Sequence, residues 1–286
     1  MDKLSSPRII EGILKKYDLH FNKRFGQNFL IDENIVEKIV LSGDVTKDDV
    51  VLEVGPGIGT MTQILARDAH AVVSVEIDKK LIPVLKDTLG EYDNVQIVEG
   101  DILKTDVYPY LKSGLDMGKN LKIVANLPYY VTTPIIMGFL EGDLPIKKMT
   151  FMIQKEVGER LCAKPSTKAY GSLTIAAQYY ADPQLDFYVP ATVFMPKPNV
   201  DSVVITMDKR EAPSFETKDK ALFFKLVRAG FLNRRKTLIN SLMGNTQYAK
   251  ADLLSAMEKA DIPSGIRGEA LTGADFARLA DHLEKL

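Results

Sequence analysis

Short apolar runs alternate with helical patterns along the first 155 residues of the chain. Apolar residues recur at helical spacing from Asp32, whose side chain is a favourable N-terminal cap, to Gly43. Five apolar runs have the length of buried strands: 50–54, 71–77, 95–98, 121–125 and 149–154. Helical patterns lie between them at 61–68, 81–89 and 133–140. This alternation predicts a parallel sheet with helices on both faces.

The pattern changes near residue 184. Apolar runs at 184–189 and 200–207 predict two strands that can pair antiparallel at the edge of the sheet. The polar segment 208–218 predicts a linker, and the remaining chain has helical patterns without a convincing strand. The expected fold is therefore α/β, with a Rossmann-like, mostly parallel sheet that has an antiparallel edge, followed by a small all-helical C-terminal domain.

The length of 286 residues is compatible with two domains. We expect residues 1–209 to form the domain that contains the sheet, and residues 210–286 to form the helical domain. Ligands of open α/β sheets bind at the carboxyl ends of the strands. The residues that follow each predicted strand are therefore the first candidates for a functional site.

Composition restricts the classes of function. The 37 basic and 38 acidic residues give a formal charge of -1, which lacks the basic excess typical of nucleic-acid binders. Cys162 is the only cysteine and the three histidines are scattered, so neither an internal disulfide nor a clustered metal site is expected. No apolar run is long enough for a membrane span, and the first residues lack an apolar signal core. We expect a cytoplasmic monomer without a metal and without membrane association.

A glycine-rich turn follows the run at 50–54 and precedes a helical pattern. The spacing of Gly55, Gly57 and Gly59 is one residue tighter than the dinucleotide-binding fingerprint, which places a pyrophosphate at the helix N-terminus. Glu53 stands just before the turn. The tighter spacing suits a ligand that needs no phosphate site, such as S-adenosylmethionine.

Two acidic residues end the next two predicted strands in order. Glu76 lies about 20 residues beyond the glycine turn, the separation at which a carboxylate accepts the ribose hydroxyls of a nucleoside. Asp101 follows the strand after that, where a carboxylate can accept an adenine amino group. Each feature alone is often only a turn or a helix cap. Together, and in this order, they predict a site for an adenine nucleoside.

The tetrapeptide Asn126-Leu127-Pro128-Tyr129 follows the fourth strand. The Asn126 side-chain oxygen and the Leu127 carbonyl can accept both hydrogens of an exocyclic amine, which frees its lone pair for attack on a methyl group. Pro128 has a fixed φ and holds the acceptor carbonyl in place. Tyr129 can stack on the base, and Phe194, between the last two strands, is a candidate for the opposite wall. Catalysis would then depend on positioning and electrostatics.

These residues together resemble the ribosomal RNA adenine N6,N6-dimethyltransferases of the KsgA/RsmA type. The resemblance covers nearly the whole chain. It depends on the motifs at 25–32, 53–59, 75–78, 100–101, 126–130, 193–202 and 228–236. The glycine motif marks only the broad class I methyltransferase fold, whereas the set as a whole is specific. The C-terminal helical segment is also similar to the second domain of this family.

The resemblance implies a role for each matching residue. Cofactor contacts with S-adenosylmethionine are implied for Asn28, Leu30, Gly55, Gly57, Gly59, Glu76, Asp101 and Asn126. Asn126 would also face the target amine, with Tyr129 and Phe194 on either side of the base. Members of the family dimethylate two adjacent adenosines in the 3'-terminal hairpin loop of small-subunit (16S) ribosomal RNA, and they act on a late, immature 30S particle.

The positions of the basic residues change the meaning of the net charge. Residues 221–241 contain five basic side chains and no acidic one, and further basic residues stand beside Asn28. We interpret these as a surface that follows RNA phosphates. The candidate RNA-binding residues are Lys23, Arg24, Arg228, Arg234, Arg235 and Lys236. Near-neutral overall charge suits a protein that recognises a folded particle rather than any RNA.

Three other functions compete with this interpretation. A methyltransferase of the macrolide-resistance type modifies large-subunit RNA and usually has Ile where this chain has Leu127. DNA adenine methyltransferases usually have a second Pro at that position. An assembly checkpoint factor of the immature 30S particle, with methylation secondary, is compatible with the same sequence.

Overall fold

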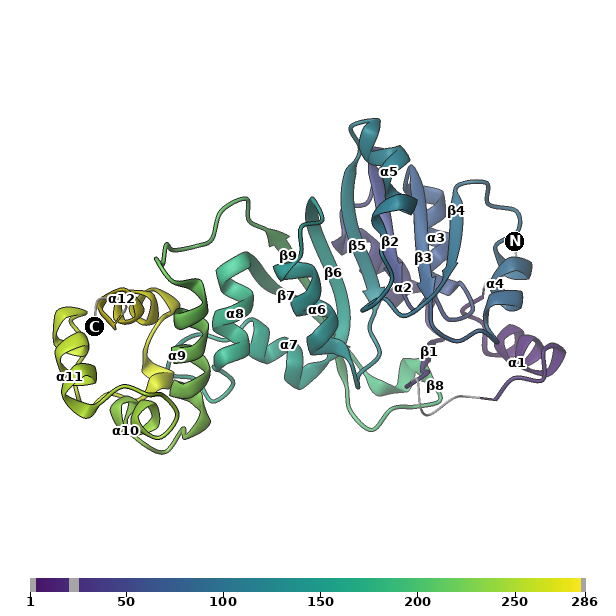
Figure 1. Ribbon diagram of the computed structural model, residues 1–286. Helices are drawn as coiled ribbons and strands as arrows, with labels where there is room; N and C mark the ends of the chain where they lie inside the picture. Colours follow the sequence, from purple (N-terminus) through teal and green to yellow (C-terminus); the bar gives the residue numbers. More distant parts are fainter. Residues whose placement is uncertain (1–3, 21–25, 284–286) are drawn as a thin grey trace. The chain divides into compact units, whose positions relative to one another are not determined.

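The computed structural model describes residues 4–20 and 26–283 (Figure 1). The chain divides into two compact units, Met1–Gly158 with Gln184–Lys209 and Glu159–Pro183 with Arg210–Leu286. The segment 159–183 was expected in the first domain but belongs to the second unit. Its residue Tyr170 is buried there, and the Tyr170 hydroxyl donates to the Leu271 carbonyl (2.8 Å).

The first unit contains a seven-stranded sheet with the order β4-β3-β2-β5-β6-β9-β7. Its strands are β2 (Asp49–Val54), β3 (Ala71–Glu76), β4 (Val95–Glu99), β5 (Asn120–Asn126), β6 (Ile146–Gln154), β7 (Ala181–Val189) and β9 (Ser202–Lys209). Strands β4, β3, β2, β5 and β6 pair in parallel, and β9 pairs antiparallel with β6. This confirms the predicted mostly parallel sheet with an antiparallel edge. The strand order reverses between β2 and β5, which is where ligands bind in such sheets.

Helices cover both faces of this sheet (Figure 1). The helices of the first unit are α1 (Pro7–Lys16), α2 (Glu33–Ser42), α3 (Thr60–Asp68), α4 (Ile82–Thr88), α5 (Tyr108–Asp116), α6 (Thr132–Glu141) and α7 (Lys155–Leu161), which continues into the second unit. Helix α1 packs through Ile10 against Ile58 of the glycine turn and Val84 of α4. Helices α2 and α3 share one buried cluster with Met152 of β6. On the opposite face, Phe139 of α6 stacks on Phe151, the neighbour of Met152 in the strand. The Asp32 side chain caps α2 as predicted, by accepting from the N–H groups of Asn34 and Ile35.

A separate two-stranded sheet joins distant parts of the first unit. Strand β1 (Phe29–Leu30) pairs antiparallel with β8 (Phe194–Met195), and Leu30 lies opposite Phe194. A 3-10 turn, Ala191–Val193, precedes β8. This pairing brings the N-terminal motif beside the Phe194 segment, close to the carboxyl ends of the main strands.

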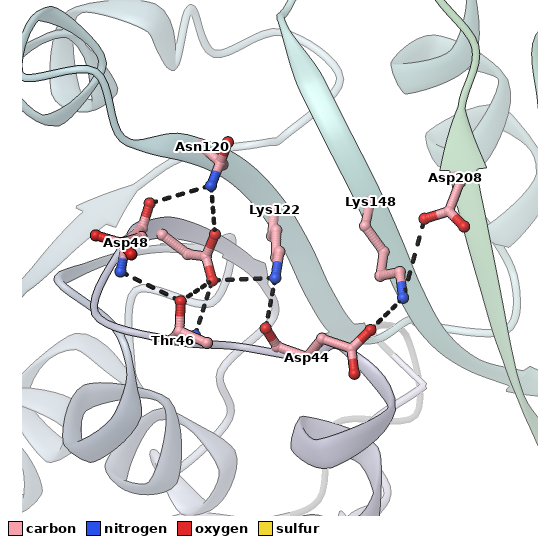
Figure 2. A network of polar contacts seen from close by, with 8 residues as sticks. Asp44, Thr46, Asp48, Asn120, Lys122, Lys148 and Asp208 are labelled. Carbon is pink, nitrogen blue, oxygen red and sulfur yellow. Dashed lines mark hydrogen bonds and ion pairs between the residues drawn. The ribbon is translucent and has the colours of Figure 1, made fainter.

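A polar network lies at the amino ends of β2 and β5, opposite to the carboxyl ends of these strands (Figure 2). The Lys122 ammonium contacts the buried Asp49 carboxylate (3.0 Å) and donates to the carbonyl of Asp44. Asp49 also accepts from Thr46 and from the Asn120 amide. Burial raises the pKa of Asp49, but the hydrogen bonds from Lys122, Thr46 and Asn120 together hold it below its usual value. The buried Asp49 carboxylate therefore has an ion-pair partner and several hydrogen-bond donors.

The second unit is helical. It contains α8 (Ser172–Tyr180), α9 (Lys220–Leu232), α10 (Leu238–Met243), α11 (Lys250–Lys259) and α12 (Gly273–Leu283). A single buried cluster includes residues of all five helices, among them Phe223 of α9 and Phe276 of α12. The expected small helical C-terminal part is confirmed, with α8 as an additional member. Within the part of the chain that the structure describes, no helix has the length and apolar character of a membrane span.

Candidate cofactor and target-base site

A cleft lies at the carboxyl ends of β2, β3 and β5, and two adjoining pockets form it. The lining of the first pocket includes Asn28, Leu30, Glu53, Gly55, Gly57, Glu76 and the whole tetrapeptide Asn126–Tyr129. The lining of the second includes Gly55, Ile77, Asp101, Leu103, Pro128 and Tyr130. Gly55, Ile77 and Pro128 line both pockets. The structure therefore brings most of the predicted cofactor and catalytic residues together in one cleft.

The glycines of the turn have different roles. Gly55 has φ +68, and no atom lies within 4 Å of the position that a Cβ would occupy. A ligand can therefore approach the backbone at Gly55 without displacing protein atoms. Gly57 has φ +65 and packs under the ring of Phe29. Gly59 does not appear in the lining of either pocket; it precedes α3, and a Cβ there would lie 3.0 Å from Leu89. Gly59 shapes the turn rather than lining the cleft.

Glu76 is fixed by backbone donors at the end of β3. Its carboxylate accepts the N–H of Asp78 (2.8 Å) and the N–H of Gly57 (3.3 Å). Burial raises the pKa of Glu76 to about 7 in the absence of a ligand. This arrangement ties the glycine turn to the adjacent strand and holds the carboxylate at the cleft.

Glu53 is the more deeply buried of the two cleft glutamates, with no exposed surface. One carboxylate oxygen, Oε2, accepts from the hydroxyls of Thr62 and Ser74, both at 2.7 Å. The other, Oε1, is buried and has no hydrogen-bond partner among the described residues. Burial raises the pKa of Glu53 to about 7. A buried acceptor without a partner at a cleft is a group that a cationic or hydrogen-donating ligand can satisfy.

The raised pKa of Glu53 predicts a pH dependence of stability. Its carboxyl has a pKa near 4.5 when unfolded and about 7 when folded, so the folded state favours the protonated form. This contribution to stability is full below pH 4.5 and is lost as the pH rises through 7, by about 3 kcal/mol. Urea unfolding without a cofactor should show that this loss is absent in Glu53→Gln. Parallel pH profiles for the two proteins would contradict the prediction.

Asp101 lies in the second pocket, at the turn after β4. One carboxylate oxygen accepts the N–H of Leu103 (3.1 Å), and the other lies 3.6 Å from the ammonium of Lys104. The side chain therefore caps a turn and also faces a pocket. The cap uses only part of the acceptor capacity of the carboxylate, so its role toward an adenine amino group stays a prediction.

The N-terminal motif covers one side of the first pocket. Asn28 and Leu30 line it, and the Gln27 amide donates to the Asp78 carboxylate (2.8 Å), which fastens the motif to the turn after β3. The predicted RNA-binding residues Lys23 and Arg24 lie outside the described residues.

Asn126 connects the cofactor side of the cleft to the tetrapeptide. Its Nδ2 donates to the carbonyl of Asn28 (3.4 Å), which leaves Oδ1 as the acceptor that the side chain presents to a ligand. The backbone N–H of Leu127 donates to the Met152 carbonyl (3.1 Å) and fixes the turn to β6. The Pro128 carbonyl accepts from the hydroxyl of Thr132 (2.9 Å). The tetrapeptide is thus held rigidly at the end of β5.

Tyr129 lines the first pocket with a half-buried ring. Its hydroxyl oxygen lies 2.5 Å from the hydroxyl oxygen of Ser202. Burial is the main reason that the pKa of Tyr129 is raised. The ring is therefore fixed at its polar end and neutral at physiological pH.

Phe194 does not line the cleft. Its side chain is 3% exposed and belongs to the buried cluster that contains Leu30, Val36 and Ile39. The pairing of β1 with β8 places it opposite Leu30, so the ring packs in the core. Its role as the second wall of a base site stays a prediction, and the ring would have to turn out of this cluster.

The candidate RNA-binding residues of the second unit differ in their contacts. Arg228, Arg235 and Lys236 are exposed, and no acidic side chain of the described residues forms an ion pair with them. Arg234 donates to the Lys168 carbonyl (2.9 Å) and forms an ion pair with Glu269 (3.1 Å). The Arg234 guanidinium therefore holds two loops together, which the charge pattern alone did not predict.

Several cleft residues escaped sequence reasoning. They are Gln27, Phe29, Pro56, Thr60, Met61, Ile77, Leu81, Ile102, Leu103, Tyr130, Val131 and Ile135. Ile77 and Leu103 lie one or two positions beyond predicted acids, so their place next to a strand end was an available signal. Leu81 and Ile135 belong to helical patterns and carried no such signal.

Comparison with known proteins gives consistent similarities. The family model described as "Ribosomal RNA adenine dimethylase" matches residues 18–285. "Ribosomal RNA small subunit methyltransferase A" of Lachnoclostridium phytofermentans is 49% identical, covering 100% of this chain and 99% of the relative. The protein of the same name in Streptococcus mutans is 47% identical, covering 99% of both chains.

Two solved structures have similar folds over most of the chain. A dimethyladenosine transferase from Plasmodium falciparum superposes with a TM-score of 0.73 at 27% identity, covering 88% of this chain and 95% of that one. The 23S rRNA methyltransferase ErmE superposes with a TM-score of 0.67 at 25% identity, covering 90% and 99%.

Proposed function

Because this chain belongs to the ribosomal RNA adenine dimethylase family and is an rRNA adenine methyltransferase, we propose that its methyl donor is S-adenosylmethionine and its target small-subunit (16S) RNA. The products are two adjacent N6,N6-dimethyladenosines in the 3'-terminal hairpin loop. The observation that carries the proposal is the position of Asn126. Asn126 lies in one cleft with Glu76 and the glycine-rich turn, and with Leu127, Pro128 and Tyr129.

The residues of the cleft suit the chemical groups of S-adenosylmethionine. The open backbone at Gly55 leaves room for the amino-acid part of the cofactor. Glu76 provides a fixed carboxylate for the ribose hydroxyls, and Asp101 provides one for the adenine amino group. The Glu53 Oε1 atom, which is buried and has no partner in the described part of the chain, favours a ligand with positive charge nearby. When bound, the cofactor supplies an electrophilic methyl group on its sulfonium.

The tetrapeptide prepares the target amine. The Asn126 Oδ1 atom and the Leu127 carbonyl accept the two N–H hydrogens of an adenine amino group. This draws the nitrogen toward a tetrahedral geometry and frees its lone pair. Both acceptors are held in place before the substrate arrives, by Asn28 and by the Leu127–Met152 hydrogen bond. Such preorganised acceptors lower the barrier without a general base.

Tyr129 forms the wall of the base site that already faces the cleft. Stacking on an aromatic ring contributes about 1–3 kcal/mol per base. We assign the opposite wall to Phe194, in a conformation in which its ring leaves the core cluster.

We further propose that the substrate is an immature 30S particle and that the enzyme works in the cytoplasm. The bacterial relatives, which are 46–49% identical, are named for the small subunit, which supports this target over the large-subunit alternative. ErmE, which is named for 23S rRNA, is 25% identical.

The direct test is methyl transfer from labelled S-adenosylmethionine to unmethylated 30S particles, 50S particles and naked 16S RNA. Mass mapping of the RNA should find two neighbouring dimethyladenosines, and only after incubation with 30S particles. Label found only on 50S particles would refute the proposal.

Arg235 and Lys236 are the best residues for testing RNA binding by the second unit. The double variant Arg235→Glu, Lys236→Glu should bind 30S particles at least about 10-fold more weakly and with a shallower salt dependence, because two phosphate contacts are lost. Arg234 is left intact because its ion pair with Glu269 is structural. Binding is measured by filter retention over a salt series.

The matched control reverses two exposed lysines of α11, Lys250→Glu with Lys259→Glu. This variant carries the same change in net charge on the same unit. An equal loss of 30S binding in both variants would show that only total charge matters, and would remove the assignment of Arg235 and Lys236.

A further inference from the structure

Ser202 is the first residue of β9, and Asp201 precedes it; together they contact three segments near Tyr129 and Phe194. The Ser202 hydroxyl contacts Tyr129, the Asp201 carboxylate accepts from Ala191, and the Asp201 carbonyl accepts the N–H of Lys155 (3.0 Å). Neither residue lines the cleft. We propose that they are positioning residues for the target adenine, which fix the ring of Tyr129 and the segment that carries Phe194 to one point of the sheet. The inference rests on the proposed function.

Ser202 provides a rigid anchor for Tyr129. Its side chain is fully buried, and its backbone lies opposite Gln154 in the antiparallel ladder of β6 and β9. The Ser202 hydroxyl oxygen is 2.5 Å from the Tyr129 hydroxyl oxygen. A contact at the hydroxyl holds the long axis of the tyrosine ring and restricts rotation about Cα–Cβ, so the position of the ring is set before a base arrives. Such preorganisation removes part of the entropy cost of ordering the ring on binding.

Asp201 acts on the other side of the base site. Its carboxylate accepts the N–H of Ala191 (2.9 Å), the first residue of the 3-10 turn that leads to Phe194. The carbonyl of Val193 at the end of this turn accepts the N–H of Ile31 (2.9 Å). The segment before Phe194 is therefore fastened at both ends. The attachment at Ala191 comes from Asp201, which is adjacent in sequence to Ser202, the contact of the Tyr129 hydroxyl.

Stacking by itself does not need this arrangement. A phenylalanine ring stacks on a base as well as a tyrosine ring does, and the Tyr129 hydroxyl points at a buried serine. The hydroxyl therefore fixes where the ring lies. A misplacement of about 1 Å at a reacting centre can cost on the order of 100-fold in rate, so a loosely held ring would affect the chemical step.

The test is a double-mutant cycle of Tyr129→Phe and Ser202→Ala. We measure kcat for methylation of unmethylated 30S particles and the Kd of S-adenosylmethionine by calorimetry. Each single variant should lower kcat about 10-fold or more. Because both changes break the same contact, the kcat of the double variant should be no lower than that of the less active single variant. The cofactor Kd should change by less than about 2-fold. A role limited to fold stability would lower the free energy of unfolding and leave kcat of the folded protein at the wild-type value.

Two further variants separate positioning from folding. Asp201→Asn keeps an acceptor for the Ala191 N–H and should retain kcat, whereas Asp201→Ala should lower it several-fold. Thr150→Val removes another fully buried hydroxyl, from the neighbouring strand β6 and without a partner among the described residues, and should leave kcat unchanged.

A kcat of wild-type size in Tyr129→Phe, or additive losses in the cycle, would overturn the proposal. If Ser202→Ala does not fold, Tyr129→Phe still breaks the same contact from the cleft, and the Asp201 pair tests the second attachment. A wild-type protein that does not methylate 30S particles would refute the proposed function instead, since every comparison uses wild-type activity as its reference.

Discussion

Replacing Glu76 with Ala is expected to weaken the binding of S-adenosylmethionine by at least about 100-fold. The carboxylate would accept both ribose hydroxyls, and hydrogen bonds to a charged group are worth about 1.5–3 kcal/mol each. The substitution also removes the acceptor for the N–H groups of Gly57 and Asp78, so the glycine turn loses its attachment to β3. Calorimetric titration with the cofactor gives the Kd directly.

Glu99→Ala is the matched control. Glu99 lies opposite Glu76 at the end of the adjacent strand β4, and its carboxylate pairs with Lys79 without lining the cleft. Its loss should leave the cofactor Kd within about 2-fold of wild type. Equal weakening by both variants would show that Glu76 acts only through the net charge of this edge. A Glu76→Ala protein that still binds immature 30S particles would separate methylation from an assembly role.

Replacing Asn126 with Ala is expected to lower kcat by about 10²–10³-fold. The loss of one preorganised hydrogen-bonding group at a reacting centre has this size, about 3–4 kcal/mol. The variant removes the Oδ1 acceptor for the target amine and the Nδ2 contact with the Asn28 carbonyl. The cofactor Kd should change less than kcat, because Glu76 and the glycine turn remain. Single-turnover methylation of 30S particles measures the chemical step.

Asn120→Ala controls for the change of residue type. Asn120 is on the same strand, β5, but at its amino end, where it donates to Asp49 in the network of Figure 2. This variant should lose some stability and keep kcat within a few-fold of wild type. If both asparagine variants lose activity to the same extent, the acceptor role of Asn126 is wrong.

The main strands were predictable because buried parallel strands are continuous apolar runs. Strands β2, β3 and β5 are buried along almost their whole length and agree with the predicted runs to within two residues. Helix α5 was missed, because Pro109 lies in its first turn and its buried positions are only Leu111 and Gly114. Helix α8 was missed because its segment lacks a clear apolar stripe, and its buried residues include Thr174.

The candidate site was also predictable where it lies at the ends of the main strands, and not where it depends on the short strands. Glu76, Asp101 and Asn126 were found because each lies at a strand end, and the carboxyl ends of parallel strands meet at one edge of the sheet. The two-residue strands β1 and β8 are too short to leave a periodic signal. Their pairing nevertheless decides where Phe194 lies.

The sequence by itself determined the alternation of strands and helices along the chain, the glycine-rich turn with its acidic residues, and the tetrapeptide that follows β5. These features depend on periodicity and on residue types at consecutive positions. Only the tertiary structure decided which side chains are already engaged: Phe194 in the core, Arg234 with Glu269, and Tyr129 with Ser202. Such contacts join residues far apart in the chain. Their existence depends on packing distances, which no local pattern contains.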